Sequence, residues 1–325
     1  MSDTLVRVFA TGGTIAGSGA RGTGRAYAPG QIGIAAMAAE VQALGIPARL
    51  EATEIAAIGS QDIGWREWDA LHLNIADALD AGDCDGIIVT HGTDTAEETA
   101  LLLDLTLPAG PPVVLAGAMR PADAVGSDGM RNFANAVRVA SDPAAAGRGV
   151  MVVMGDEIFA ASDVRKAATN SIAAFRGFPR GPIGNVTPSS LDWFGPAART
   201  GEAARFGWPA GLPQVDILHA YAGLTACSVE ALLGCGAKGL VLAGVGGGNA
   251  PAAVLDALAA SGVPVVRASR VDQGYVDRNL EVDDDARGFV AARSYGPAKA
   301  RILLQLLLAS GITDPLAMQA HFDRR

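Results

Sequence analysis

Short apolar segments that do not alternate with polar residues recur in the first part of the chain, each followed by a turn that contains glycine. The first spans residues 5–10, and another spans residues 87–90, ahead of a helical pattern rich in alanine and leucine. Strands that are apolar throughout are typical of parallel sheets covered by helices on both faces. "PPVVLAGAMRP" and "RGVMVVMGD" supply two more such segments. We therefore predict an α/β fold with a parallel sheet.

The chain of 325 residues is long enough for two domains. Residues 194–213 lack periodicity and are rich in Gly, Pro and Arg, which is typical of a linker. We expect a larger N-terminal parallel-sheet α/β domain (1–194), a linker (195–213) and a smaller C-terminal α/β domain (214–325). Within the smaller domain, strands are predicted near 215–219, 239–243 and 263–267, and helices near 228–234, 251–260 and 297–309.

Composition and charge exclude several classes of function. The net charge of -9 comes without a basic stripe, so no nucleic-acid partner is expected. No apolar run reaches membrane-spanning length, so no membrane association is expected. The start, "MSDTLVRVF", has neither a basic segment nor a long apolar core. No signal peptide is visible, which predicts a cytoplasmic location, or a periplasmic one if an upstream signal has been removed.

The cysteines and histidines do not have the spacing of a metal site. Cys84, Cys227 and Cys235 are an odd number, and each stands beside small residues, where a buried thiol fits. A disulfide framework is therefore not expected, in agreement with a reducing compartment. The four histidines are scattered, and none forms a ligand pair. We predict no metal.

Hydroxyl and carboxyl side chains follow two of the apolar segments. Thr11 and Thr14 flank the glycines after the first segment, and Thr93 and Asp94 follow the second. Ligands of open α/β sheets bind outside the carboxyl ends of strands, so these side chains are expected to face one crevice. For two of these residues a purely structural role is the alternative. Thr11 could form only a local hydrogen bond, and Asp94 could be a helix N-cap with Glu97 completing a partial capping box.

A threonine hydroxyl becomes a good nucleophile only when a neighbouring group takes its proton. His91 lies within the second turn, and Lys166 in "ASDVRKAAT" is the other candidate base. Only three of the 25 basic side chains are lysines, and a guanidinium cannot be deprotonated in proteins. A lysine retained in such a chain indicates a role in proton transfer, while a solvated surface lysine is the competing interpretation.

The glycine-rich stretch "GSGARG", residues 17–22, matches the dinucleotide fingerprint G-x-G-x-x-G. That fingerprint must join a strand directly to a helix, and the residues that follow here have no helical period. Residues 17–30 are interpreted instead as a mobile loop, with Tyr27 as its one large side chain.

"ATGGTIAGSG" and "VTHGTDTAEETA" together resemble the two signature motifs of the bacterial homotetrameric L-asparaginases, a family that includes type II asparaginases and glutaminase-asparaginases. "IGSQD", "GAMRP", "SDVRK", "AGVGGGN" and "LEVDD" lie in the same order as their family counterparts, over essentially the whole chain. The resemblance implies hydrolysis of L-asparagine to L-aspartate and ammonia through a threonyl acyl-enzyme, with secondary L-glutaminase activity. It also implies that no cofactor is needed, and that the protein is a homotetramer built as a dimer of dimers.

The resemblance assigns a role to each matching residue. Thr14 would be the nucleophile with Tyr27 as its partner, and a second catalytic cluster would comprise Thr93, Asp94 and Lys166. The substrate-binding roles would fall on Ser60, Gln61 and Asp94 for the α-carboxylate and α-amino groups, on the Ala118 carbonyl for the side-chain amide, and on Asn249 and Glu281 for the site of a neighbouring subunit.

Two alternative functions fit part of the same residue pattern. A non-catalytic amino-acid sensor on the same scaffold needs contacts to carboxylate and ammonium but no nucleophile, so the joint presence of Thr14, Thr93 and Lys166 argues against it. The asparaginase-like subunit of transamidation complexes shares both signatures but carries an extra N-terminal domain, whereas the first motif here begins at residue 10. The ratio of asparaginase to glutaminase activity is not predicted, because one methylene is worth only about 1 to 3 kcal/mol in a pocket.

Overall fold

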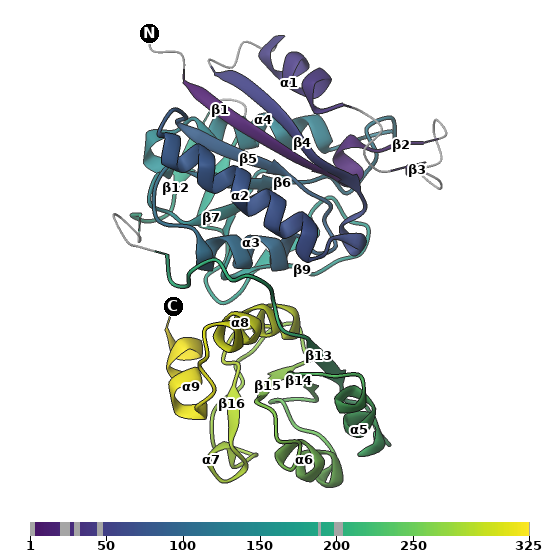
Figure 1. Ribbon diagram of the computed structural model, residues 1–325. Helices are drawn as coiled ribbons and strands as arrows, with labels where there is room; N and C mark the ends of the chain where they lie inside the picture. Colours follow the sequence, from purple (N-terminus) through teal and green to yellow (C-terminus); the bar gives the residue numbers. More distant parts are fainter. Residues whose placement is uncertain are drawn as a thin grey trace. The chain divides into compact units, whose positions relative to one another are not determined.

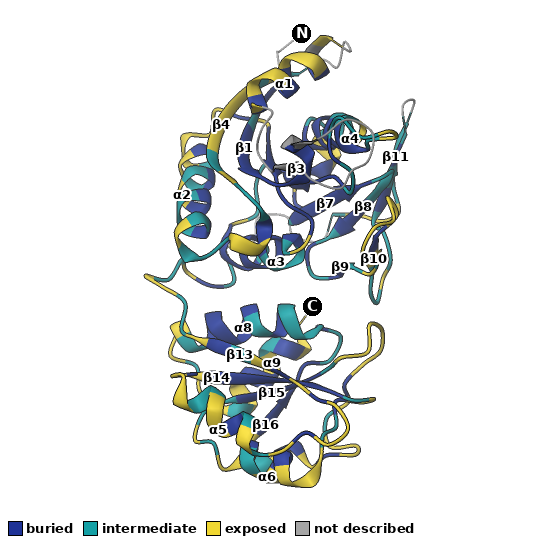
Figure 2. Ribbon diagram, turned by 90° about the vertical axis from the view of Figure 1, so that its right-hand side faces the viewer, coloured by how far each residue is buried: buried dark blue, intermediate teal, exposed yellow. Residues whose placement is uncertain are grey.

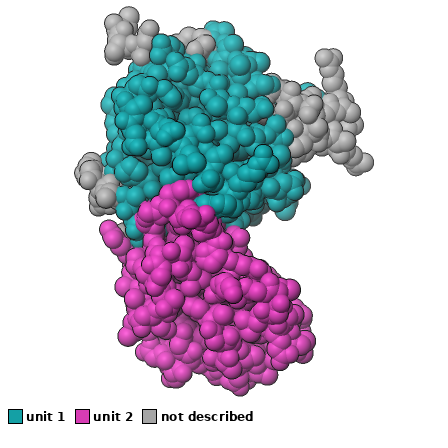
Figure 3. Space-filling view, viewed as in Figure 1, with its two compact units in different colours: residues 1–205 teal, residues 206–325 magenta. Residues whose placement is uncertain are grey.

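The chain folds into two compact units, Met1–Arg205 and Phe206–Arg325 (Figure 3), called here the N-terminal and the C-terminal unit. The computed structural model describes residues 4–19, 27–28, 33–43, 48–187, 190–197 and 204–324. The division falls inside the segment predicted as a linker. The predicted α/β class, with a larger sheet domain followed by a smaller one, is confirmed.

An eight-stranded sheet forms the centre of the N-terminal unit, in the order β12-β11-β8-β7-β6-β5-β1-β4 (Figure 1). The parallel strands are β1 (Leu5–Gly12), β4 (Arg49–Ile58), β5 (Gly86–Thr90), β6 (Val113–Ala116) and β7 (Val150–Met154). The antiparallel strands are β8 (Glu157–Ala160), β11 (Gly184–Val186) and β12 (Leu191–Trp193). These antiparallel strands were not predicted, because they are too short to show an alternating pattern.

Two further strand pairs lie outside this sheet. In one, β2 (Ser18–Gly19) pairs antiparallel with β3 (Tyr27–Ala28). In the other, β9 (Val164–Lys166) pairs antiparallel with β10 (Phe175–Gly177) and forms a hairpin. Lys166 therefore lies at the end of a hairpin strand, which brings its side chain back toward the main sheet.

Both faces of the inner parallel strands, β1, β5, β6 and β7, are buried under helices. Leu5 and Phe9 of β1 belong to one apolar cluster, and Val6 and Val8 belong to the other, because successive side chains of a strand point to opposite faces. The covering helices are α2 (Trp65–Ala81) and α3 (Ala96–Thr106) on the first face, and α1 (Ile34–Ala43) and α4 (Gly129–Ala140) on the second. Figure 2 shows β1 and β7 as buried and the edge strand β4 as largely exposed. The continuous apolar runs of the sequence have this two-sided burial as their cause.

A four-stranded parallel sheet forms the centre of the C-terminal unit, in the order β13-β14-β15-β16. Its strands are β13 (Val215–His219), β14 (Gly239–Gly244), β15 (Val265–Ser269) and β16 (Phe289–Ala291). Its helices are α5 (Cys227–Gly234), α6 (Ala252–Ala259), α7 (Asp284–Arg287), α8 (Pro297–Ala309) and α9 (Pro315–Asp323). The three strands and three helices predicted from the sequence are present, while β16, α7 and α9 were not predicted.

Side chains from helices bond to both outer strands of this smaller sheet. Gln319 of α9 accepts the Ala291 N–H at 2.8 Å and donates its amide nitrogen to the Ala291 carbonyl at 3.1 Å. Its amide thus pairs with β16 much as another strand would. At the opposite edge, Arg301 Nε of α8 donates to the Val215 carbonyl of β13 at 3.1 Å.

Candidate active site

The end of β1 turns sharply and meets the turn that follows β5. Gly13 has φ 80° and ψ −175°, a conformation that only glycine adopts readily. A Cβ atom at Gly13 would lie 2.5 Å from both the Cα and the nitrogen of Gly92. Residues 12–14 (the Thr14 turn) therefore lie in backbone contact with residues 91–95 (the Thr93 turn). The two glycine-threonine motifs meet because β1 and β5 are neighbours in the sheet.

Lys166 joins the Thr93 turn from the β9–β10 hairpin. Its Nζ donates to Thr93 Oγ1 at 2.9 Å and to Asp94 Oδ1 at 2.5 Å. The Lys166 side chain is only 17% exposed, whereas that of Asp94 is 61% exposed. The interpretation of Lys166 as a solvated surface residue is therefore wrong. An ammonium group can only donate, so the Thr93 oxygen accepts this bond and its own proton is not used in it.

Asp94 does not cap helix α3. The helix begins at Ala96 with Thr95 at its N-cap, and the Thr95 hydroxyl donates to the Ser60 carbonyl at 2.8 Å. Glu97 accepts the backbone N–H of Lys166 at 3.2 Å and so fastens the hairpin to the first turn of α3. The N-cap interpretation is therefore wrong, because the turn is one residue longer than the sequence pattern suggests. Asp94 instead forms a charge-assisted bond to the lysine.

Ser60 and Gln61 belong to a 3-10 turn, Ser60–Asp62, that follows β4. Ser60 is buried, and a Cβ atom at Gly92 would lie 2.7 Å from its Oγ, so Ser60 lies directly against the Thr93 turn. Gln61 is exposed, and its amide donates to Asp62 at 3.0 Å. Strand β4 thus adds a third chain segment to the same edge of the sheet.

The segment after β6 is the fourth to reach this edge, and it carries the buried Ala118. A Cβ atom at Gly117 would lie 3.0 Å from Thr93 Cγ2. The Asp128 carboxylate accepts the backbone N–H groups of the two residues after Ala118 at 3.0 to 3.1 Å. No motif in the sequence points to Asp128, because its partners lie eight and nine residues away.

His91 is held in a buried chain of hydrogen bonds. Thr99 Oγ1 lies 2.9 Å from His91 Nε2, and His91 Nδ1 lies 2.7 Å from the Gly92 carbonyl. Trp68 Nε1 donates to Thr99 Oγ1 at 2.8 Å. An indole N–H can only donate and a carbonyl can only accept, so the chain runs from Trp68 through Thr99 and His91 to Gly92. No spacing in the sequence singles out Trp68 or Thr99.

Burial lowers the pKa of His91 to about 4, against the hydrogen bond to the Gly92 carbonyl, which raises it. His91 is therefore neutral near pH 7, and both of its ring nitrogens are engaged. Of the two candidate bases, His91 bonds to Thr99 and to the Gly92 carbonyl, whereas Lys166 contacts the hydroxyl of Thr93, a predicted site residue. Thr11, similarly, has the structural role of donating to the Thr90 carbonyl at 3.0 Å.

Three further predicted site residues belong to other parts of the chain. The backbone of Tyr27 pairs with Gly19, but its side chain and residues 20–26 and 29–32 lie outside the described part of the chain. The mobile loop therefore stays a prediction. Asn249 and Glu281 lie in the C-terminal unit, where Asn249 Nδ2 donates to Glu281 Oε2 at 3.3 Å.

Two of the three cysteines differ from expectation. Cys84 is buried, but Cys227 and Cys235, at the two ends of α5, are exposed. Their small neighbours belong to helix ends and turns rather than to the core. Within the described ranges, no cluster of three or more metal-ligating side chains occurs. No helix in these ranges is long and apolar enough to cross a membrane.

The fold and the site define a class of two-unit α/β proteins in which four parallel-strand ends converge on a threonine-rich polar site. Residues 5–199 match the family described as Asparaginase, N-terminal, and residues 214–322 match the Glutaminase/Asparaginase C-terminal domain. The chain belongs to the asparaginase family, as its sequence motifs predicted.

Several relatives span almost the whole chain. The "Probable L-asparaginase periplasmic" of Haemophilus influenzae is 42% identical over 98% of this chain and 92% of its own length. The L-asparaginase 2 of Escherichia coli is 40% identical with the same coverage of both chains. The Glutaminase-asparaginase of Pseudomonas fluorescens is 39% identical over 93% of this chain and 86% of its own. A crystal structure of a probable cytoplasmic L-asparaginase from Campylobacter jejuni, 34% identical, covers 99% of this chain and 100% of its own with a TM-score of 0.92.

Proposed function

We propose that the protein hydrolyses the side-chain amide of L-asparagine to L-aspartate and ammonia through a threonyl acyl-enzyme. The observation that carries this proposal is the Lys166–Thr93–Asp94 cluster, held against the turn that bears Thr14. Membership of the asparaginase family supports the choice of substrate. The name of the glutaminase-asparaginase relative supports L-glutamine as a secondary substrate.

The proposed reaction has two displacements. The Thr14 hydroxyl oxygen attacks the amide carbon, the carbon–nitrogen bond breaks, and the hydroxyl proton leaves with ammonia. Water then attacks the resulting threonyl ester, releases L-aspartate and returns a proton to Thr14. Dividing one difficult displacement into two easier ones is the general benefit of a covalent intermediate.

Lys166 and Thr93 supply the proton path in this proposal. Because Thr93 Oγ1 accepts from the Lys166 ammonium, Thr93 can pass its own proton to the departing nitrogen while a lysine proton replaces it. The proton that Thr14 gives up on attack restores the Lys166 ammonium, which Asp94 stabilises. Tyr27 is expected to contact Thr14 from the loop of residues 17–30.

The exposed Asp94 carboxylate is proposed to bind the substrate's α-ammonium group, for which a charge-assisted bond is well suited. Ser60 and Gln61 are proposed to bind the α-carboxylate and α-amino groups together with it. The Ala118 carbonyl would accept a hydrogen bond from the substrate amide. In this arrangement the amide lies between the two threonine turns.

We further propose a homotetramer, a dimer of dimers, in which Asn249 and Glu281 complete the site of a neighbouring subunit. Closed dihedral symmetry is the common form of such assemblies. Light scattering should then give four times the chain mass of 33.0 kDa. A fully active monomer on dilution would contradict this proposal.

The decisive experiment compares Thr14→Ala with Thr14→Ser. Removal of the attacking hydroxyl should abolish ammonia release from L-asparagine while calorimetry still detects aspartate binding, and serine should retain part of the turnover. Undiminished activity of Thr14→Ala would refute the threonyl mechanism. A wild-type protein that binds L-asparagine but releases no ammonia would establish the non-catalytic sensor instead.

A further inference from the structure

Asn249 and Glu281 lie on two separate segments of the C-terminal unit. Asn249 ends the glycine-rich turn of residues 244–249, and Glu281 lies in the loop of residues 277–284, which leads into α7. The Asn249 side-chain oxygen, Oδ1, accepts the Ala250 N–H at 2.8 Å, which orients the side-chain nitrogen, Nδ2, toward Glu281 Oε2 at 3.3 Å. Residues 245–249 and 277–283 belong to no helix or named strand, so contacts outside the regular elements must fix the relative position of Asn249 and Glu281.

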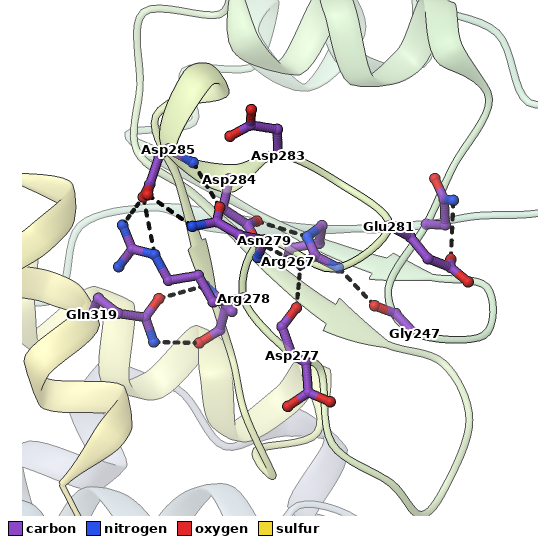
Figure 4. A network of polar contacts seen from close by, with 12 residues as sticks. Gly247, Arg267, Asp277, Arg278, Asn279, Glu281, Asp283, Asp284, Asp285 and Gln319 are labelled. Atoms are coloured by element: carbon purple, nitrogen blue, oxygen red, sulfur yellow. Dashed lines mark hydrogen bonds and ion pairs between the residues drawn. The ribbon is translucent and has the colours of Figure 1, made fainter.

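A single buried arginine bonds to both segments (Figure 4). Arg267, on β15, is 1% exposed, and its Nε and one terminal nitrogen donate to the Asp284 carboxylate at 2.8 and 2.7 Å. The same terminal nitrogen donates to the Asp277 carbonyl at 2.9 Å. The other donates to the Gly247 carbonyl at 2.6 Å. One guanidinium group thus holds both ends of the Glu281 loop and the middle of the Asn249 turn.

The Glu281 loop is shaped to make these bonds. Asn279 has φ 57°, a left-handed conformation that asparagine tolerates better than most residues. Its N–H donates to Asp284 at 2.9 Å, so the Asp284 carboxylate accepts three bonds while fully buried. The Asn279 side chain exchanges two further bonds with Asp285, at 2.7 and 3.1 Å.

The Asn249 turn is shaped for close approach as well. Val245 and Asn249 exchange two backbone hydrogen bonds at 2.8 Å, which closes the turn. A Cβ atom at Gly248, whose φ is 89°, would lie 3.0 Å from an Arg267 terminal nitrogen. The glycines of "GVGGGN" thus let the backbone reach the guanidinium group.

We propose that Arg267 is a positioning residue that holds Asn249 and Glu281 as one preassembled pair within each C-terminal unit. The inference rests on the proposed function, in that the pair is presented to a substrate. A planar guanidinium has five N–H donors in a fixed fork and can reach three separate acceptors, whereas a lysine ammonium is a compact point charge. The pair is therefore set before any substrate or neighbouring subunit is engaged.

The test uses Arg267→Lys, which keeps the charge but loses the fork, in the full-length protein. Its matched control is Arg287→Lys in the same unit, where the arginine forms a partly exposed ion pair with Asp256 at 2.8 Å. If Arg267→Lys does not fold, the double variant Arg267→Met with Asp284→Leu replaces both buried charges with apolar groups, an exchange that proteins often tolerate.

Hydrogen exchange gives a readout that does not depend on activity. Amides of residues 244–249 and 277–283 should exchange faster in Arg267→Lys, or in the double variant, and remain at wild-type rates in Arg287→Lys. Unchanged exchange in both segments would overturn the proposal whether or not the protein hydrolyses L-asparagine. An absence of hydrolysis by the wild type would refute the proposed function separately.

Kinetics then link the loops to the reaction. Arg267→Lys should lower kcat/KM for L-asparagine by about 10- to 100-fold, mainly through KM, because small misplacements of binding groups carry losses of this size. In a Glu281→Gln background the same change should have little further effect. Fully additive losses would show that Arg267 does not act through Glu281 and would overturn the positioning role.

Discussion

Thr99→Val should destabilise the N-terminal unit far more than its modest change in shape suggests. Thr99 is fully buried in α3, where its hydroxyl accepts from Trp68 and donates to His91. Valine has a similar volume but no hydroxyl, so two buried polar atoms lose their partner at once. Each unsatisfied buried group costs about 1 to 3 kcal/mol, which gives an expected loss of roughly 2 to 6 kcal/mol.

The same helix offers a matched control. Thr106 is also buried, and its hydroxyl donates only to the Leu102 carbonyl at 2.7 Å. Inside the helix, the Leu102 carbonyl also accepts the backbone N–H of Thr106, four residues later. Thr106→Val therefore leaves this carbonyl with a hydrogen-bond partner. We expect a loss of about 1 kcal/mol or less for this control.

Urea unfolding followed by tryptophan fluorescence, at one protein concentration, measures both variants. Thr99→Val should also lower kcat, because the hydrogen-bond chain ends on the Gly92 carbonyl in the Thr93 turn. Equal losses of stability in the two variants would refute the reasoning that the hydrogen bonds from Trp68 through Thr99 and His91 to Gly92 stabilise the fold.

Three further predictions concern the same site. Gly13→Ala should abolish turnover, because its Cβ would press on the Gly92 backbone. The control Gly82→Ala, at φ 63° in open space, should cost only about 1 to 2 kcal/mol of stability and retain activity. Steady-state assays measure the turnover of both variants, and urea midpoints measure their stability. Lys166→Met should lower kcat more than it raises KM, and an effect confined to KM would exclude a role in proton transfer. The pKa of His91 is lower in the folded protein, at about 4, than in the unfolded chain, at about 6.5, so its stabilising contribution is fully present above pH 6.5 and is lost as the pH falls to about 4. The loss is about 3 kcal/mol, and unfolding titrations should show a smaller fall in His91→Gln than in the wild type.

The strand ends of this protein could be predicted from sequence because burial on both faces produces an unmistakable apolar run. β1 and β5 were located in this way, and the meeting of the Thr14 and Thr93 turns follows from their adjacency in the sheet. Asp94 illustrates the limit, since a shift of one residue in a helix start decides whether a carboxylate caps a helix or faces a lysine.

Contacts across long sequence distances could not be predicted in the same way. Trp68 and Thr99 come from different helices, and their hydrogen bond depends on how both pack on the sheet. Arg267 is an arginine inside a predicted strand, and its side chain can be buried because Asp284 neutralises it. Partners that are this distant in the sequence cannot be identified from local sequence patterns.

The amide of Gln319 along β16 has a consequence for how this protein meets other chains. An open parallel sheet normally presents unpaired backbone groups at its outer strands, and these recruit strands from other molecules into aggregates. In the C-terminal unit, an incoming strand would first have to displace Gln319 from Ala291 on one side, or Arg301 from Val215 on the other. Association by extending the C-terminal sheet at these two positions is thus disfavoured.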